Sequence, residues 1–266
     1  MLKKVLVTGS SGYLGKNFIN QFSNNYELLK FSLIKNTLKS LKFSDISTVL
    51  HCAGLVHNYK KITKSDYYKI NNRYPLNLAK LAKENGVNHF IFISTVAVYD
   101  KKLEYINEKS LCNPYSIYGK SKLKTENELL ELESKTFNVS IIRIPMIYGI
   151  DAPGNIKKLT SFVKFVPFLP FKNLNNKRSI IHINKICSFI DDVIKKKVSG
   201  ILLLSDDISY TLPEIIKIIE KQEGIKVILF RLPFIKVFFK YIFPDFYKKI
   251  FLNLIIENSK TLKRLE

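Results

Sequence analysis

The 266-residue sequence has no tryptophan, only two methionines, and three cysteines at Cys52, Cys112 and Cys187. The cysteines are odd in number, widely scattered and form no CxxC motif, which predicts free thiols in a reducing compartment. The four histidines also lack the spacing of metal ligands, and we therefore expect no metal site.

Long apolar runs are absent as well. The N-terminal stretch MLKKVLVTGSSG has only three consecutive apolar residues at 5–7, which is too short for the core of a signal peptide. No other stretch reaches the length needed to cross a bilayer. These features predict a cytoplasmic protein without a transmembrane span.

Acidic residues are scarce: 22 of them stand against 43 lysines and arginines, which gives a formal net charge of +21. Such an excess is compatible with nucleic acid or an anionic membrane as partner. The lysines are spread along the chain, however, and this pattern favours solvated surface lysines over a nucleic-acid site. A basic surface would still attract an anionic substrate.

Short apolar segments alternate with helical patterns along the first 205 residues, and the apolar segments lack inside–outside alternation. This is typical of an α/β protein whose parallel sheet is covered on both faces. Strands are expected at 5–8, 26–31, 48–52, 90–94, 139–144 and 200–204, and helices at 13–24, 65–85, 119–135, 183–197 and 211–223. Residues 150–178 are rich in proline and asparagine and are expected to be irregular and lid-like.

Three glycines follow the first expected strand in the stretch TGSSGYLG, at Gly9, Gly12 and Gly15. In a strand–loop–helix context this spacing permits a tight turn, close approach of backbone to a pyrophosphate, and close helix–strand packing. The N-terminus of the following helix would offer free N–H groups to the phosphates. The pattern therefore favours a dinucleotide-binding loop over a plain turn.

Tyr118 and Lys122 are four residues apart at the start of an expected helix, within YGKSK, and would share one helix face. A lysine ammonium beside a phenol favours the phenolate and lowers its pKa, which suits acid–base chemistry near neutral pH. Lysine is abundant in this chain, so the pair alone could also be a chance match.

Taken together, the motifs resemble the extended short-chain dehydrogenase/reductases, in particular the NAD-dependent epimerase/dehydratase group acting on nucleotide sugars. Segments similar to those of the family occur in order: TGSSGYLG (8–15), HCAG (51–54), YKIN (68–71), ISTVAVY (93–99), YGKSK (118–122), RIPMIYG (143–149) and RSIIHI (178–183). The resemblance implies a Rossmann-like doubly wound parallel sheet with a small C-terminal substrate lobe. Residues 1–150 would form the dinucleotide-binding domain and 151–266 mainly the substrate-binding lobe, with 179–205 returning to the sheet.

The resemblance also implies roles for individual residues. The catalytic set would be Thr95, Tyr118 and Lys122, with Tyr118 as the acid–base residue. NAD, with NADP as the alternative, would contact Gly9, Ser11, Gly12, Tyr13, Leu14, Gly15, Ala53, Gly54, Asn71, Tyr118, Lys122 and Pro145. The substrate would contact Thr95, Tyr118, Asn155 and Arg178, where a guanidinium suits a diphosphate.

Two departures from the family pattern concern the cofactor and the C-terminus. The position that normally carries an acidic residue for the NAD ribose is near Ser32, with Lys30 and Lys35 close by, and the stretch between Phe31 and Ile46 is short. The segment Asn258–Ser259–Lys260 is similar to the D-x-[ST]-K segment of the family, without the usual helix after it.

The expected activity is that of a UDP-sugar 4-epimerase, of the UDP-N-acetylhexosamine type used for surface polysaccharides, in a homodimer. A 4-keto-sugar reductase is the alternative, and a non-catalytic dinucleotide-binding regulator is an alternative of another class. Dehydratases of the family carry T-D-E after the fifth strand, whereas this chain has Thr95-Val96-Ala97.

Residues 232–243, LPFIKVFFKYIF, are apolar and aromatic with two lysines. They could lie on a membrane surface. We favour instead a helix that packs in the small lobe with its lysines solvated.

Overall fold

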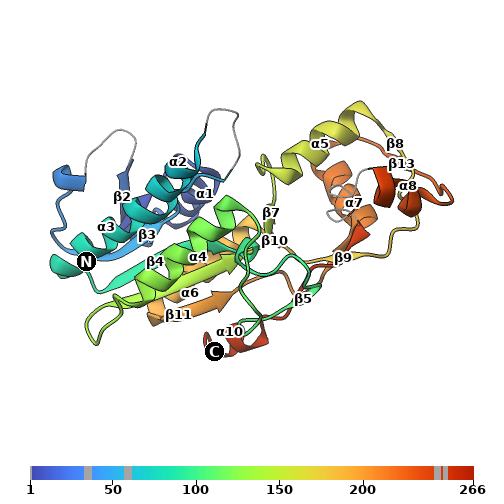
Figure 1. Ribbon diagram of the computed structural model, residues 1–266. Helices are drawn as coiled ribbons and strands as arrows, with labels where there is room; N and C mark the ends of the chain where they lie inside the picture. The colour runs from blue at the N-terminus through green and yellow to red at the C-terminus, as the bar shows by residue number, and fades with distance from the viewer. Residues whose placement is uncertain (1, 33–37, 57–61, 243–246, 248–250) are drawn as a thin grey trace.

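The computed structural model describes residues 2–32, 38–56, 62–242, 247 and 251–266, and Figure 1 shows their arrangement. Its centre is a six-stranded parallel sheet in the order β11-β6-β4-β3-β1-β2. The strands are β1 Lys3–Thr8, β2 Tyr26–Phe31, β3 Ile46–His51, β4 His89–Thr95, β6 Asn138–Ile144 and β11 Gly200–Leu203. The predicted α/β fold with a doubly wound parallel sheet is confirmed.

Side chains of β1 point alternately to the two faces of the sheet. Val5 and Val7 pack into a core with α1 (Tyr13–Phe22) and α6 (Ile183–Lys196), whereas Leu6 packs into a second core on the other face. That second core includes Leu78 of α3 (Tyr74–Glu84) and Leu129 of α4 (Ile117–Leu130). Because both faces are covered, the middle of the sheet consists largely of apolar side chains, as the sequence pattern indicated.

The helical stretch expected at 65–85 consists of three successive segments. α2 (Lys64–Tyr68) begins with a capping box between Thr63 and Asp66, and α3 ends the stretch. Between them, η2 (Lys69–Arg73) is a turn of π-helix. Such wide turns often occur at functional sites, and this one contains Asn71.

A separate lobe follows the sheet and lies at the right of Figure 1. It contains α5 (Asn155–Phe165), α7 (Leu212–Glu223), α8 (Ile235–Ile242) and the paired strands β8 (Phe168–Leu169) and β13 (Ile228–Leu229) around a core of their own. The remaining short elements are η1 Leu38–Ser40, η3 Val96–Val98, β5 Tyr105–Ile106, β7 Met146–Tyr148, β9 Lys177–Arg178, β10 Ile180–His182, β12 Tyr210–Thr211, β14 Ile255–Ile256 and α10 Ser259–Lys263.

Two expectations about helices were wrong. Residues 150–178 are not uniformly irregular, because Ile156 and Val163 are buried on one side of α5 and hold it on the lobe core. The helix expected at 119–135 ends at Leu130, where a turn begins and Ser134 pairs with Phe137. Among the helices of the described ranges, none has the length and apolar character to cross a membrane.

Candidate active site

The chain leaves β1 for the sheet edge at β2 and returns on the other side of β1 at β3. In a doubly wound sheet this change of direction opens a crevice at the carboxyl ends of the strands, where ligands bind. The glycine loop follows β1 and the HCAG segment follows β3, so both lie at this crevice. Ser32 directly follows β2, next to Phe31, which pairs with Thr8.

The glycine loop is built so tightly that two of its glycines leave no room for a side chain. Gly9 has a φ of +69°, and a Cβ there would lie 2.6 Å from the backbone nitrogen of Ala53. A Cβ at Gly15 would lie 2.4 Å from the carbonyl oxygen of Gly9. The loop therefore packs directly against both α1 and the segment after β3.

The N-terminus of α1 is open to a ligand. Gly12 is its N-cap residue and provides no side-chain cap, while Ser11 and Gly12 are exposed. A Cβ at Gly12 would touch only the Gly9 carbonyl oxygen, at 3.1 Å, so the rest of its surroundings are open. Free N–H groups and space at a helix N-terminus fit the pyrophosphate of a dinucleotide. The structure buries Leu14 in the core below.

Tyr13 connects this loop to the segment that leads into the lobe. Its hydroxyl donates to the carbonyl oxygen of Ile150 at 2.9 Å, and it passes close to Gly149. Burial and the charge of Asp151 raise the pKa of Tyr13 to about 12, so the side chain acts as a neutral donor. Its contact with a cofactor remains a prediction.

Asn71 fixes the segment that follows β3. Its amide donates to the carbonyl oxygen of Leu55 at 3.0 Å and accepts from the Leu55 N–H at 2.7 Å. The same amide donates to Ser121 of α4 at 3.2 Å. The π-turn thus places Asn71 where it holds Ala53 and Gly54 against the helix that carries the predicted catalytic pair.

Thr95 and Tyr118 meet at the end of β4. Tyr118 is the second residue of α4, whose N-cap Ser116 accepts from the Gly119 N–H at 3.0 Å. Gly119 is needed there, because a Cβ would lie 2.3 Å from the carbonyl oxygen of Ala97. The hydroxyl groups of Thr95 and Tyr118 lie close enough for Thr95 to lower the Tyr118 pKa. The family resemblance implies that both groups contact the reacting oxygen, and this role remains a prediction.

The pKa of Tyr118 is shifted in the direction opposite to the sequence-based expectation. Burial raises it to about 12, and the nearby Thr95 hydroxyl only partly offsets this effect. The expectation that Lys122 lowers this pKa was therefore wrong for the protein alone. The reason is the direction of the lysine side chain, which reaches into the sheet.

Lys122 is buried beneath the HCAG segment. Its Nζ donates to the carbonyl oxygen of Ile93 at 2.8 Å and lies 4.1 Å from the ring centre of Phe92. A Cβ on Gly54 would lie 3.5 Å from this nitrogen. Desolvation lowers the pKa of Lys122 to about 8. A buried cation at this position fits the ribose hydroxyls and the charge of a nicotinamide nucleotide.

The sequence analysis did not identify Glu126, which lies on the same face of α4 as Tyr118 and Lys122. It lies four residues after Lys122, and that spacing was the available signal. Glu126 is completely buried, accepts from the Ser94 hydroxyl and pairs with Arg143 at 2.6 Å. Arg143, the first residue of the RIPMIYG segment, therefore holds α4 on the sheet.

The other predicted residues lie on the lobe side of the crevice. Pro145 is buried between β6 and β7, and Asn155 is exposed as the first residue of α5. Arg178 belongs to β9, which pairs with β12, and its guanidinium donates to the carbonyl oxygen of Leu252 at 3.3 Å. Desolvation lowers the pKa of Arg178. Substrate contacts of Asn155 and Arg178 remain predictions.

A polar cluster between the sheet and the lobe was also missed. The Tyr148 hydroxyl donates to Asp206 at 2.8 Å and lies 3.5 Å from the Tyr210 hydroxyl. Asp206 accepts from the His182 backbone N–H at 3.2 Å, and the rings of Tyr148 and His182 meet edge to face. Burial raises the pKa of Tyr148. The cluster fixes the strands β7 and β10 on which the lobe is mounted.

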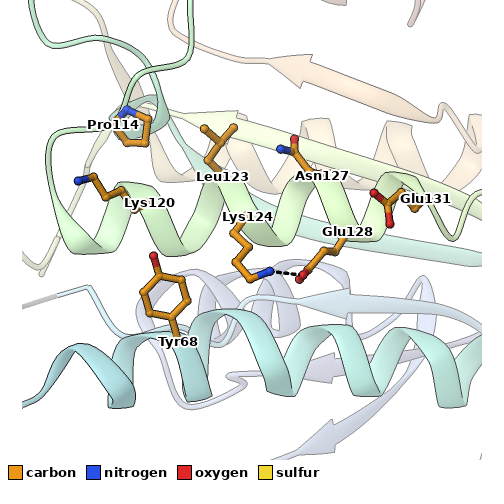
Figure 2. A pocket seen from close by; sticks show the side chains of 8 residues that line it. All are labelled: Tyr68, Pro114, Lys120, Leu123, Lys124, Asn127, Glu128 and Glu131. Carbon is orange, nitrogen blue, oxygen red and sulfur yellow. Dashed lines mark hydrogen bonds and ion pairs between the residues drawn. The ribbon is translucent and has the colours of Figure 1, made fainter.

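A surface cavity of about 500 Å³ lies away from this crevice, on the outer side of α4. Figure 2 shows its lining, with the ion pair of Lys124 and Glu128 on the side of α4 that faces the helical stretch carrying Tyr68. Because Lys122 and Glu126 point to the opposite side of the helix, this cavity is separate from the candidate active site.

The comparisons with known proteins agree with this geometry. Residues 5–202 match the model of the NAD dependent epimerase/dehydratase family. The chain belongs to this family. The predictions of the family, of an enzyme of the epimerase and reductase kind, and of a nicotinamide cofactor are thereby confirmed.

Three curated relatives illustrate the range of similarity. UDP-glucose 4-epimerase of Vibrio cholerae is 28% identical over 82% of this chain and 75% of its own length. Methionine adenosyltransferase 2 subunit beta of Danio rerio is 28% identical over 55% of this chain and 49% of its own. The third relative is N-acetyl-alpha-D-glucosaminyl-diphospho-ditrans,octacis-undecaprenol 4-epimerase of Escherichia coli O157:H7. It is 27% identical over 75% of this chain and 66% of its own length.

Solved structures share the fold. UDP-N-acetylglucosamine 4-epimerase from Bacillus cereus superposes with a TM-score of 0.76 at 21% identity, covering 98% of this chain and 92% of that one. A dTDP-4-dehydrorhamnose reductase from Clostridium acetobutylicum has a TM-score of 0.72 at 26% identity. The match covers 86% of this chain and 83% of the reductase chain. The same fold thus occurs in epimerases and in reductases.

Proposed function

We propose that the chain is a 4-epimerase that exchanges hydride at C4 of a UDP-sugar of the N-acetylhexosamine type for surface polysaccharide synthesis. The observation that carries this proposal is the meeting of Thr95 and Tyr118 at the end of β4, with Lys122 buried beside Gly54. Similarity to the Vibrio and Bacillus epimerases supports the reaction type.

The residues divide the chemistry between them. A bound nicotinamide would supply the hydride acceptor and donor. Tyr118 takes the proton from the sugar O4 and returns it, while Thr95 holds the same oxygen by a hydrogen bond. Lys122 would bind the ribose hydroxyls of the nucleotide. Arg178 holds the diphosphate, so the sugar ring can turn while the nucleotide stays bound.

A reductase of 4-keto nucleotide sugars is a second candidate, which the 26% identity to the Clostridium reductase favours. A non-catalytic regulator on the same fold is a third, favoured by similarity to a methionine adenosyltransferase subunit. The presence of Thr95, Tyr118 and Lys122 at one crevice argues against the third candidate.

The test is incubation of the purified protein with UDP- and dTDP-sugars, followed by NMR assignment of the sugar at C4. If the chain is an epimerase, the two C4 epimers should interconvert without net consumption of NADH. Stoichiometric oxidation of NADH or NADPH with a 4-keto sugar would instead identify the reductase. Nucleotide binding without turnover on any of these sugars would favour the regulator.

We further propose a cytoplasmic homodimer that pairs through the outer face of α4. That face carries Lys120 and Lys124 near its start and Glu128 and Glu131 near its end (Figure 2). In an antiparallel two-fold arrangement, the basic half of one helix would meet the acidic half of the other. Light scattering of Lys120→Glu should then report a monomer, whereas Lys80→Glu on α3 should remain a dimer.

A further inference from the structure

The helix α8 presents an apolar face to solvent. Val237 and Tyr241 are 52% and 77% exposed, and their spacing of four residues places them on one side of the helix. Phe234, in the turn just before the helix, is 84% exposed. The side that packs inward carries Phe239, whose ring lies 5.7 Å from that of Phe251. The expected helix of the small lobe is present as α8 with Lys236 and Lys240 exposed, but Phe234, Val237 and Tyr241 do not pack in the lobe core.

Other elements of the same lobe also expose apolar side chains. Phe168 and Ile228 are directly paired between β8 and β13, and both are exposed. Phe230, two residues further along, is exposed as well, and Phe165 at the end of α5 is 87% exposed. Figure 1 shows α8, β8 and β13 gathered in the lobe, away from the central sheet. Soluble proteins rarely expose so many large apolar side chains in one region unless they bind a partner there.

The charge of the same region is predominantly positive, although Glu223 of the adjoining α7 pairs with Lys164 of α5. Residues 152–172 and 224–242, which include α5, β8, β13 and α8, hold eight lysines and arginines and no acidic residue. Lys236 and Lys240 are exposed and flank the apolar face of α8. A second copy of this chain would bring the same positive charge against itself. A surface with apolar side chains between cations matches instead a bilayer with anionic headgroups.

We propose that the α8 surface, defined by Phe234, Lys236, Val237, Lys240 and Tyr241, docks on an anionic lipid bilayer. The aromatic and valine side chains enter the headgroup region, and the two ammonium groups remain with the lipid phosphates. The chain attaches to the membrane surface and does not span it. This attachment is independent of the reaction proposed above, because α8 lies outside the crevice.

Vesicle flotation of the full chain tests the proposal. Vesicles of phosphatidylcholine with 30% phosphatidylglycerol should float the protein, vesicles of phosphatidylcholine alone should float much less, and added salt should weaken binding. Two variants probe the two contributions, Phe234→Ser/Val237→Ser/Tyr241→Ser and Lys236→Gln/Lys240→Gln. Each should reduce partitioning at least about tenfold. Nucleotide binding and the melting temperature show that each variant is folded.

The matched control is Lys80→Gln/Lys135→Gln, which removes the same charge from exposed positions outside the lobe. This control should bind vesicles like the unmodified chain. If the control and Lys236→Gln/Lys240→Gln lost vesicle binding equally, the proposal would be overturned, because the attraction of the protein to the vesicles would then depend only on its net charge. Failure of the unmodified chain to float would also overturn it. The proposal would also be overturned if Phe234→Ser/Val237→Ser/Tyr241→Ser bound vesicles like the unmodified chain but no longer self-associated. The α8 surface would then be a contact between two copies of the chain.

Discussion

Arg143 and Glu126 form a buried ion pair that joins β6 to the helix carrying Tyr118 and Lys122. The Arg143 Nη2 donates to Glu126 Oε2 at 2.6 Å and its Nε to the same oxygen at 3.1 Å. Both side chains are at most 3% exposed. Each charge is stabilised in the interior mainly by the other, so the pair is a strong constraint on the position of α4.

Glu126→Gln should lower the free energy of unfolding by about 3 kcal/mol, because it leaves the Arg143 charge buried without a counter-ion. Urea denaturation followed by circular dichroism measures this value. Glu128→Gln is the matched control on the same helix, since its pair with Lys124 is at the surface. The control should cost at most about 1 kcal/mol. Equal losses in the two variants would contradict the structural role assigned to the buried pair.

Tyr118→Phe should reduce kcat at least about 100-fold, because it removes the group that transfers the proton at the sugar oxygen. Nucleotide affinity should change little, since the ring remains. Tyr115→Phe is the control: Tyr115 lies three residues earlier and is 76% exposed. Steady-state kinetics with UDP-N-acetylglucosamine measures both variants. A Tyr118→Phe enzyme with unchanged kcat would remove Tyr118 from the mechanism.

The parts of the fold that sequence predicted well have local signals. Gly9, Gly12 and Gly15 mark a strand–loop–helix whose geometry depends on residues close in sequence, and β2 was predicted to the residue. The end of α4 was misplaced because no glycine or proline marks Leu130. The helix α5 was missed because Pro153 and Pro167 on either side suggested irregular structure.

The parts of the site that sequence did not predict depend on contacts between distant segments. The pairing of Glu126 with Arg143, and of Tyr148 with Asp206, joins residues on different elements. Helical spacing identified the residues that share a helix face with Tyr118. It did not identify the residues of other elements that this face contacts. The same limit explains the Tyr118 pKa, because the direction of the Lys122 side chain is set by the carbonyl of Ile93.

Buried neutral histidines should make the protein sensitive to acid. Desolvation lowers the pKa of His51 to about 3 and that of His89 to about 4. Below about pH 6.5 the unfolded chain binds protons that the folded chain does not, so stability falls as pH falls. By pH 5 the loss should be about 2 kcal/mol for each histidine.

Urea denaturation at pH 7.5 and pH 5 measures this difference. In His89→Gln the loss of stability between the two pH values should be about 2 kcal/mol smaller than in the unmodified chain. An identical loss in both proteins would show that His89 does not contribute to acid sensitivity.

Cofactor preference should depend on Ser32, which follows β2 where related folds place an acid for the ribose diol. Without that acid, a 2′-phosphate is not repelled, and Lys30 at the end of β2 is exposed; Lys35 lies outside the described residues. Ser32→Asp should therefore weaken NADP binding at least about tenfold while NAD binding is kept or improved. Fluorescence titration with both nucleotides measures the ratio, and an unchanged ratio would place the ribose elsewhere.

The chain should not eliminate water from its sugar. Dehydratases resembling this family use an acid and a base directly after the position of Thr95, but here Val96 and Ala97 form the short turn η3. The Ala97 N–H donates to the Thr95 hydroxyl at 3.1 Å, which fixes the turn, and neither apolar side chain can transfer a proton. Mass spectrometry of reactions with UDP-glucose, dTDP-glucose and UDP-N-acetylglucosamine should therefore find no product lighter by one water. A 4-keto-6-deoxy sugar that accumulates with intact enzyme, and disappears in Tyr118→Phe, would contradict the assignment of hydride exchange at C4 as the complete reaction.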